Sequence, residues 1–179
     1  GYLFFVNEKM FRDAGIDIPK TPEDLLTAAK ALTRDGKYGY AVTNDNTVNF
    51  MRDALEIVTG VGGVWVKDGK WNFTDPKVVQ GIDLWRDLAL NYAPKGTDIA
   101  AKHQSFYDGN VAMMIENASI WAQVKSQGKP ELVEDMHLAP MPFEVWPGDV
   151  SHGFSIPTGL SEEDTQIAWE LLETVTSPE

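Results

Sequence analysis

The chain has 179 residues, of which 43 % are hydrophobic and 23 % are charged. This is the balance of a folded globular protein, so an intrinsically disordered or fibrous chain is excluded. With 27 acidic against 15 basic residues the formal net charge is -12, which disfavours nucleic acid and anionic membrane surfaces as partners. Six carboxylates, and no lysine or arginine, fall within residues 161–179.

Cysteine is absent from the sequence. Its absence excludes disulfide frameworks, thiolate metal sites and cysteine nucleophiles together. The apolar run at residues 2–6 is too short to cross a bilayer, and it lacks the basic flank and cleavage site of a signal peptide. Because the chain does not begin with methionine, we expect it to be a processed or trimmed piece of a longer protein.

Residues 1–36 predict one strand and two helices. The apolar and aromatic run at 2–6 is typical of a buried strand, and a helical spacing follows it and ends at Gly15. The next segment has the clearest helix signature of the chain, because Thr21 can cap a helix that begins at Pro22 and continues towards Gly36.

Residues 38–73 predict a strand, a helix and a hairpin. Alternating residues indicate a strand over 38–43, which ends in a polar loop. A helix over 50–58 is expected to turn four residues towards the core, namely Met51, Ala54, Leu55 and Val58. A glycine-rich turn then leads to a hairpin whose strands flank Asp68 and Gly69, a pair that favours a tight turn.

Helices and strands continue to alternate over the rest of the chain. The predicted segments are a helix capped by Asp75, a helix over 99–108, a strand over 110–116, a helix over 118–126, strands over 136–142 and 151–157, and a helix capped by Ser161. Strands separated by helices in this way favour an α/β fold, with a central mixed β-sheet flanked by helices.

Catalytic and metal-binding motifs do not occur in the sequence. The three histidines, His103, His137 and His152, are far apart in the chain and lack the spacing of metal ligands. The glycine-rich turn at 60–63 lacks the lysine and hydroxyl residue of a phosphate loop. We therefore predict no catalytic residue, no metal and no cofactor.

The six tryptophans are the residues most typical of a binding site, because aromatic faces pack against the C–H faces of sugars. By context they divide into helix-face residues expected in the core (Trp85 and Trp169), hairpin residues that cross-strand packing explains equally well (Trp65 and Trp71), and loop residues better suited to binding (Trp121 and Trp146).

Five segments occur in an order that is typical of one known family. They are YLFFVNEKMFRDAGIDIPKTPEDLLTAAKALT, VTGVGGVWVKDGKWNFTDPKVVQGIDLWRDL, FYDGNVAMMIENASIW, the pair LAPMP and SHGFSIP, and AWELLETVTSPE. Together they make the chain similar to the family 1 extracellular solute-binding proteins, the maltose-binding-protein-like receptors of ABC importers.

This resemblance implies a fold of two α/β lobes that close over a solute bound in the cleft between them. The chain is similar mostly to the second lobe, a lobe of the periplasmic-binding-protein type II kind. The implied organisation is a solute-binding lobe over 1–150, a return crossover strand over 151–160 and a helix over 161–179. In the family that helix packs on the other lobe, so here it is expected either to fold back or to pair with a second copy in a homodimer.

The resemblance also nominates ligand-binding residues in three places: the loop after the 38–43 strand, the segment similar to the family's NGPW motif, and the strand before the return crossover. They are Asn44, Asp45, Asn49, Arg52, Glu116, Asn117, Ser119, Trp121, His152 and Gly153. Ser119 stands where the family usually has an aromatic ring for stacking. Either Trp121 supplies that ring, or this lobe offers less stacking.

The implied function is that of a non-catalytic, solute-binding component of an ABC transporter, present here as a partial chain. Its expected partners are a small-molecule solute, a carbohydrate or similar compound, and the importer's membrane permease. The expected location is periplasmic or extracellular, with lipid anchoring as in some relatives. Two alternatives stay open: a fragment of a carbohydrate-active hydrolase that uses carboxylates such as Asp45, Glu116 and Asp149, and a protein-interaction module.

Overall fold

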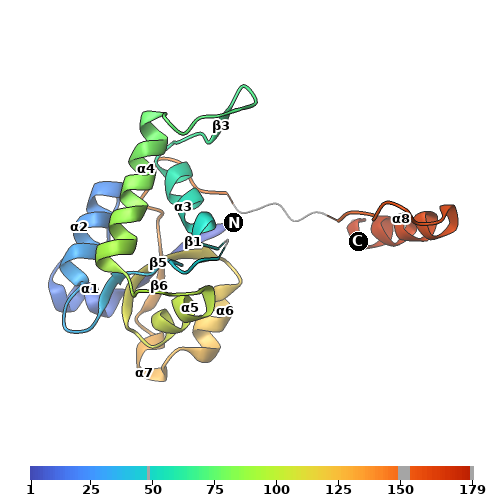
Figure 1. Cartoon of the computed structure of the whole chain (residues 1–179). Helices are drawn as coiled ribbons and strands as arrows, with labels where there is room; N and C mark the ends of the chain where they lie inside the picture. The colour runs from blue at the N-terminus through green and yellow to red at the C-terminus, as the bar shows by residue number, and fades with distance from the viewer. Residues whose placement is uncertain (48, 149–153, 178–179) are drawn as a thin grey trace. The chain divides into compact units, whose positions relative to one another are not determined.

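The structure is a computed structural model and describes residues 1–47, 49–148 and 154–177. The chain divides into two compact units, Gly1–Asp149 and Val150–Glu179 (Figure 1). The first unit contains the sheet and most of the helices, and the second contains one helix. No helix in the described part of the chain is long and apolar enough to span a bilayer.

The first unit is built on a four-stranded mixed sheet. Its strands are β1 (Tyr2–Asn7), β2 (Tyr38–Tyr40), β5 (Val111–Asn117) and β6 (Met136–Ala139), in the order β2-β5-β1-β6. The β2–β5 pair is parallel, whereas β1 is antiparallel to both β5 and β6. Because β2 and β5 run in the same direction, the loops that follow them leave from the same edge of the sheet.

Helices cover both faces of this sheet (Figure 1). In chain order they are α1 (Glu8–Ala14), α2 (Pro22–Leu32), α3 (Asn49–Gly60), α4 (Pro76–Asp87), the π-helical turn η1 (Leu88–Tyr92), α5 (Ile99–Tyr107), α6 (Ile120–Gln127) and α7 (Pro130–Val133). Phe4 belongs to a core cluster with residues of α1, α2 and α4, and Phe5 to one with residues of α5 and α6. Successive strand residues thus fill opposite cores, which confirms the predicted mixed sheet flanked by helices.

Local signals place most element ends where the sequence predicts them. The hydroxyl of Thr21 accepts a hydrogen bond from the Asp24 amide at 3.1 Å, and Asp75 caps α4 in the same way. The hairpin forms as β3 (Val66–Lys67) and β4 (Lys70–Trp71). Strand β2 is shorter than expected. The Ala41 amide still bonds to the Met113 carbonyl, but the Thr43 amide bonds to the Asp53 carboxylate.

The buried face of α3 differs from the predicted one. Ala54 and Val58 are buried as expected, but Met51 is 41 % exposed. Asp53 and Glu56 are buried in its place. Hydrophobic periodicity assigns charged side chains to the solvent, so it cannot find a helix face that buries acids against a basic partner on another element.

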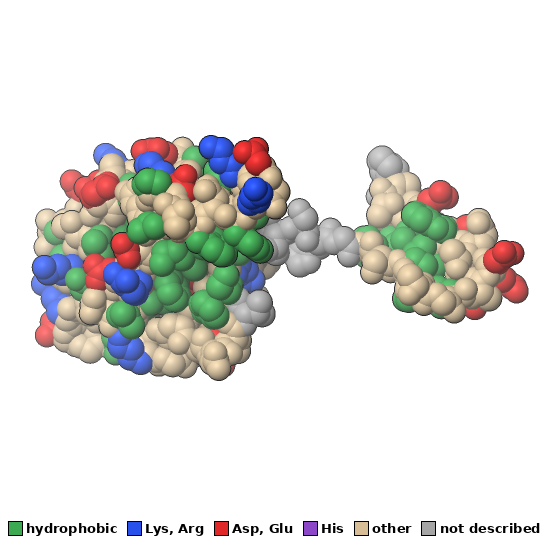
Figure 2. Space-filling model, turned by 45° about the horizontal axis from the view of Figure 1, so that its top comes forward, with side chains coloured by type: hydrophobic (Ala, Val, Ile, Leu, Met, Phe, Trp, Pro, Cys, Tyr) green, Lys and Arg blue, Asp and Glu red, His purple; other side chains and the backbone are tan. Residues whose placement is uncertain are grey.

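The second unit contains α8 (Glu162–Thr176), which begins at its predicted cap Ser161. Figure 2 shows apolar side chains of this unit gathered on one face, with acidic side chains around them. Trp169 is 55 % exposed, so its prediction as a core residue is wrong for the described chain, in which no side chain of α8 is buried. The strand predicted over 151–157 does not form in its described part, 154–157.

Candidate functional site

Polar side chains gather where β5 ends and α3 begins. Glu116 and Asn117 are the last residues of β5, and Arg52 lies in the first turn of α3. Lys102 and His103 reach the same place from α5. The parallel β2–β5 pair positions the cluster, because it brings the loop that leads into α3 beside the end of β5.

Glu116 is the centre of this cluster and is 0 % exposed. Its carboxylate accepts hydrogen bonds from His103 Nε2 at 2.9 Å, from the Asn117 amide at 2.9 Å and from Arg52 at 3.4 Å. Burial on its own would raise the pKa of Glu116. The His103 hydrogen bond, the charge of Lys102, the Asn117 amide and the charge of Arg52 instead hold this pKa well below its usual range.

Lys102 supplies a buried positive charge beneath Glu116. It is 1 % exposed, and its Nζ lies 3.0 Å from Asp53 Oδ1, 3.0 Å from the Ile115 carbonyl and 3.4 Å from Glu116 Oε2. Burial would lower the pKa of Lys102, but the charges of the neighbouring carboxylates raise it above its usual range. Removing one member would leave a partner charged and buried, which costs free energy. The same cost opposes any movement that separates the members, so they are held in fixed positions.

Glu56 is buried beside this network without a close hydrogen bond in the described structure. Its Oε1 has no hydrogen-bond partner among the described residues and lies 4.0 Å from Arg52 Nε. Burial raises the pKa of Glu56 well above its usual range, and the charges of Asp53 and Glu116 raise it further, against the lowering effect of Lys102 and Arg52. Burial thus acts against the charged form of Glu56.

Three side chains extend from the buried cluster to the protein surface. The side chain of Arg52 is 23 % exposed, while Nδ2 of the partly exposed Asn117 donates to Glu116 Oε1 at 2.9 Å. Asn117 Oδ1 in turn accepts from the amide and the hydroxyl of the exposed Ser119. The arrangement presents guanidinium, amide and hydroxyl groups that are held from below, which suits hydrogen bonding to a solute with several hydroxyl groups.

The structure brings together four of the nominated residues: Arg52, Glu116, Asn117 and Ser119. Asn44 instead ties its loop to another, because its side chain accepts from the Thr97 amide at 2.7 Å and donates to the Pro94 carbonyl at 2.6 Å.

The other nominated residues lie around this group or outside the described chain. Asp45 accepts from Thr47 in a turn, and Asn49 is the first residue of α3. The ring of Trp121 packs 6.3 Å from that of Phe5, under the Lys125 ammonium. His152 and Gly153 lie outside the described residues.

Sequence reasoning missed four members of the cluster: Asp53, Glu56, Lys102 and His103. A signal for Lys102 was present, since it stands four residues before the buried Phe106 and so on the inward face of its helix. An inward lysine needs a buried acid, and Asp53 and Glu56 occupy the buried face of α3. The spacing alone does not say which acid on which helix pairs with which base.

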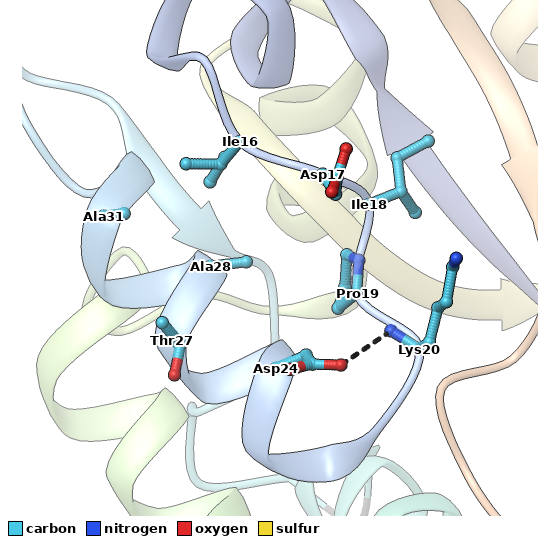
Figure 3. Close-up of a pocket in the computed structure, with 9 residues that line it drawn as sticks. All are labelled: Ile16, Asp17, Ile18, Pro19, Lys20, Asp24, Thr27, Ala28 and Ala31. Carbon is cyan, nitrogen blue, oxygen red and sulfur yellow. Dashed lines mark hydrogen bonds between the residues drawn. The ribbon is translucent and has the colours of Figure 1, made fainter.

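Two recesses elsewhere in the first unit lack such a cluster. One of about 310 Å³ lies beside the first turn of α3, where Asn44 and Asp45 line it together with the rings of Phe50 and Trp85, 6.0 Å apart. Another, of about 290 Å³, lies between α2 and residues 16–20 (Figure 3). Both apolar and polar residues line it, and the residues drawn share a single hydrogen bond, from the Lys20 amide to Asp24, so we do not assign it a function. Within the described ranges, no group of three or more His, Asp and Glu side chains is arranged to hold a metal ion.

Comparison with known proteins gives a family match over the whole chain. The model of the family described as bacterial extracellular solute-binding protein matches residues 1–179. YcjN of Escherichia coli K12, described as an ABC transporter periplasmic-binding protein, is 29 % identical over 126 residues, which cover 67 % of this chain and 29 % of YcjN.

Solved structures share the fold. The solute-binding protein of an Agrobacterium radiobacter K84 ABC transporter, in complex with ribitol, matches with a TM-score of 0.79 and 19 % identity over 97 % of this chain and 46 % of its own. The solute-binding protein from Thermotoga lettingae TMO, bound with α-D-tagatose, matches with a TM-score of 0.75 and 25 % identity, over 98 % and 47 %. The chain thus spans about half the length of these structures and less than a third of YcjN.

Proposed function

The chain belongs to the bacterial extracellular solute-binding protein family, and on this premise we propose that it binds a sugar or polyol for an ABC importer. Members of this family are transporter components and not enzymes. Their usual location is extracellular or periplasmic, and we propose the same for the protein that contains this chain, with the importer's permease as its partner. Lipid anchoring stays a prediction.

The observation that carries this proposal is the group of partly and fully exposed polar side chains at the end of β5. Arg52, Asn117 and Ser119 present hydrogen-bonding groups whose positions the buried Glu116 and Lys102 fix from below. Related proteins of the same fold were solved with ribitol and with α-D-tagatose, both of which are uncharged and carry several hydroxyl groups. Donors fixed before the solute arrives lose little conformational entropy on binding it.

The hydrolase alternative has little support in the described structure. It requires two carboxyl groups across a sugar subsite, roughly 5 to 10 Å apart in a cleft. Glu116 is fully buried and engaged with four partners, and Asp45 accepts from Thr47 within its own turn. Asp149, the third acid considered, lies outside the described residues. We therefore propose binding without catalysis.

The interaction alternative is favoured by one observation, the exposed apolar face of α8. Ile167, Leu171 and Val175, which are spaced four residues apart and so share one side of the helix, are each more than half exposed. We propose that this face pairs with a second copy of the chain when no other partner covers it.

Solute binding is tested by NMR titration of the 179-residue chain with ribitol and with α-D-tagatose. We expect dissociation constants in the millimolar range, which correspond to a binding free energy of about -4 kcal/mol. Binding should be this weak because one compact unit supplies all of the donors. The side-chain signals of Arg52 and Asn117 should shift, and the substitutions Arg52→Ala and Asn117→Ala should each weaken binding about fivefold or more.

A matched control is Arg34→Ala, which removes an arginine whose recorded bond is to the Asp13 carbonyl at 3.5 Å. This variant should bind both solutes as the unchanged chain does. Solute-induced shifts that avoid Arg52 and Asn117, or equal losses in all three variants, would contradict the assignment of the site.

A further inference from the structure

The charges beneath the candidate site are arranged in pairs. Lys102 and Asp53 approach to 3.0 Å, and Arg52 and Glu116 to 3.4 Å. All except Arg52 are essentially buried, so water screens their fields weakly. Within the described cluster, the positive charge of Arg52 is therefore not free to act on a solute by itself.

The balance of these charges is close to zero. Arg52 and Lys102 supply two positive charges, and Asp53 and Glu116 supply two negative ones. Glu56 Oε1 lies 4.0 Å from Arg52 Nε, so any charge on this carboxyl group is negative and offsets Arg52 further. A solute that reaches Arg52 consequently meets a guanidinium group whose positive charge is offset by the carboxylate of Glu116.

Glu116 also lies where its negative charge would repel an anion that approaches Arg52. Both of its oxygens lie 3.4 Å from the same guanidinium nitrogen of Arg52. A negative group on the exposed side of Arg52 would stand within about one Debye length, roughly 8 Å, of this carboxylate. Removing a solute's charge from water costs free energy, which a new ion pair would have to offset. Arg52 is already paired with Glu116, so it offsets little of this cost.

We propose that Glu116 makes the site selective for uncharged polyhydroxylated solutes, because it neutralises Arg52 and so excludes sugar acids and sugar phosphates. This inference rests on the proposed function and names its substrate class. Glu116 is then a specificity-determining residue that acts through Arg52, while Lys102 holds the Glu116 carboxylate in place.

The first test compares ribitol with ribonate, in which a carboxylate replaces one terminal CH₂OH group. We expect the unchanged chain to bind ribonate at least tenfold more weakly than ribitol. Glu116→Gln should raise the affinity for ribonate about tenfold while it changes that for ribitol about threefold or less. The control Glu131→Gln removes the same formal charge from an exposed position on α7 and should leave both affinities unchanged.

The second test uses inorganic sulfate and does not depend on solute binding. In the unchanged chain, sulfate should leave the Arg52 Nε–H signal in place at concentrations that shift the signal of the exposed Arg34. In Glu116→Gln the Arg52 signal should shift as well. If Glu116→Gln proves unfolded by circular dichroism, the measurements on the unchanged chain decide the question.

Two outcomes would overturn the inference: ribonate binding as tight as ribitol binding in the unchanged chain, or a sulfate-induced shift at Arg52 as large there as in Glu116→Gln. If neither ribitol nor ribonate binds, the proposed function fails, and the sulfate experiment still decides the role of Glu116.

Discussion

Glu56 gives the buried cluster a distinct response to pH. It is 5 % exposed, and burial raises its pKa well above the usual range. An unfolded chain releases this proton near its ordinary pKa of about 4.3, so the folded state holds it more tightly. The contribution of Glu56 to stability is therefore complete below that value and is lost as the pH rises towards the folded pKa, by about 1.4 kcal/mol for each unit of the pKa difference.

We expect Glu56→Gln to remove this loss. The free energy of unfolding is measured by urea denaturation and tryptophan fluorescence. As the pH rises from 5 to 8, this free energy should increase for the variant relative to the unchanged chain. Glu131→Gln, an exposed control, should follow the unchanged chain at every pH. A Glu56→Gln difference that is constant across this range would show that Glu56 does not titrate abnormally.

The nominated site residues show what a sequence can and cannot predict here. Arg52, Asn117 and Ser119 could be nominated from the resemblance to the family, and the structure places them together around Glu116. Lys102 and Asp53 were not found, because their pairing joins two helices that are far apart in the chain. A charged side chain on a helix is ordinarily exposed to solvent. The buried positions of Lys102 and Asp53 follow from their contact in the folded structure, which the sequence pattern does not show.

Helices α3 and α4 pack closely at one glycine. A Cβ atom on Gly81 would lie 2.5 Å from Val58 Cα, which is backbone and cannot move aside as a side chain would. The two helices thus approach at this point only because residue 81 lacks a side chain. Their packing in turn sets the position of α3, whose first turn carries Arg52.

We expect Gly81→Ala to destabilise the protein although alanine is the better helix former. The gain in helix propensity is about 1 kcal/mol. Overpacking costs about 1 to 3 kcal/mol, and the cost is higher where the contact is with backbone. The free energy of unfolding should therefore fall by about 1 to 2 kcal/mol. Chemical denaturation measures it. Gln80→Ala, at the exposed neighbouring position, is the control and should be neutral or slightly stabilising. Equal stability of the two variants would mean that the helices are less tightly packed than described.

Most elements could be predicted because their ends depend on local chemistry. Thr21, Asp75 and Ser161 cap helices by side-chain hydrogen bonds within a few residues, and the Asp68-Gly69 turn is equally local. The inward position of Met51 and the full length of β2 were predicted wrongly. At both places Asp53 has a buried role that the pattern did not indicate, because it pairs with Lys102 and accepts from the Thr43 amide.

The chain as a whole spans about half the length of its solved relatives and divides into two compact units. Half of the formal charge of -12 belongs to residues 161–179, where the acids lie beside an apolar helix face. Such a face in water favours association, whereas the surrounding like charges oppose it.

We expect a dimer that depends on protein and salt concentration, measured by light scattering. Higher salt should strengthen it, because salt screens the acidic rim and leaves the apolar contact intact. Leu171→Asp should abolish it, whereas Gln166→Ala, an exposed control on the same helix, should not. A chain that stays monomeric up to about 1 mM at high salt would rule out this pairing.

The position of β1 inside the sheet has a consequence for how the protein is made. Tyr2 pairs with Asn117 and Phe4 with Ala139, so β1 is synthesised well before both strands with which it pairs. Until then the run that contains Phe4, Phe5 and Val6 has two open edges, and the cores that its side chains enter are incomplete. Folding must therefore wait for β5 and β6, and the nascent chain is the form most exposed to aggregation and most in need of a chaperone.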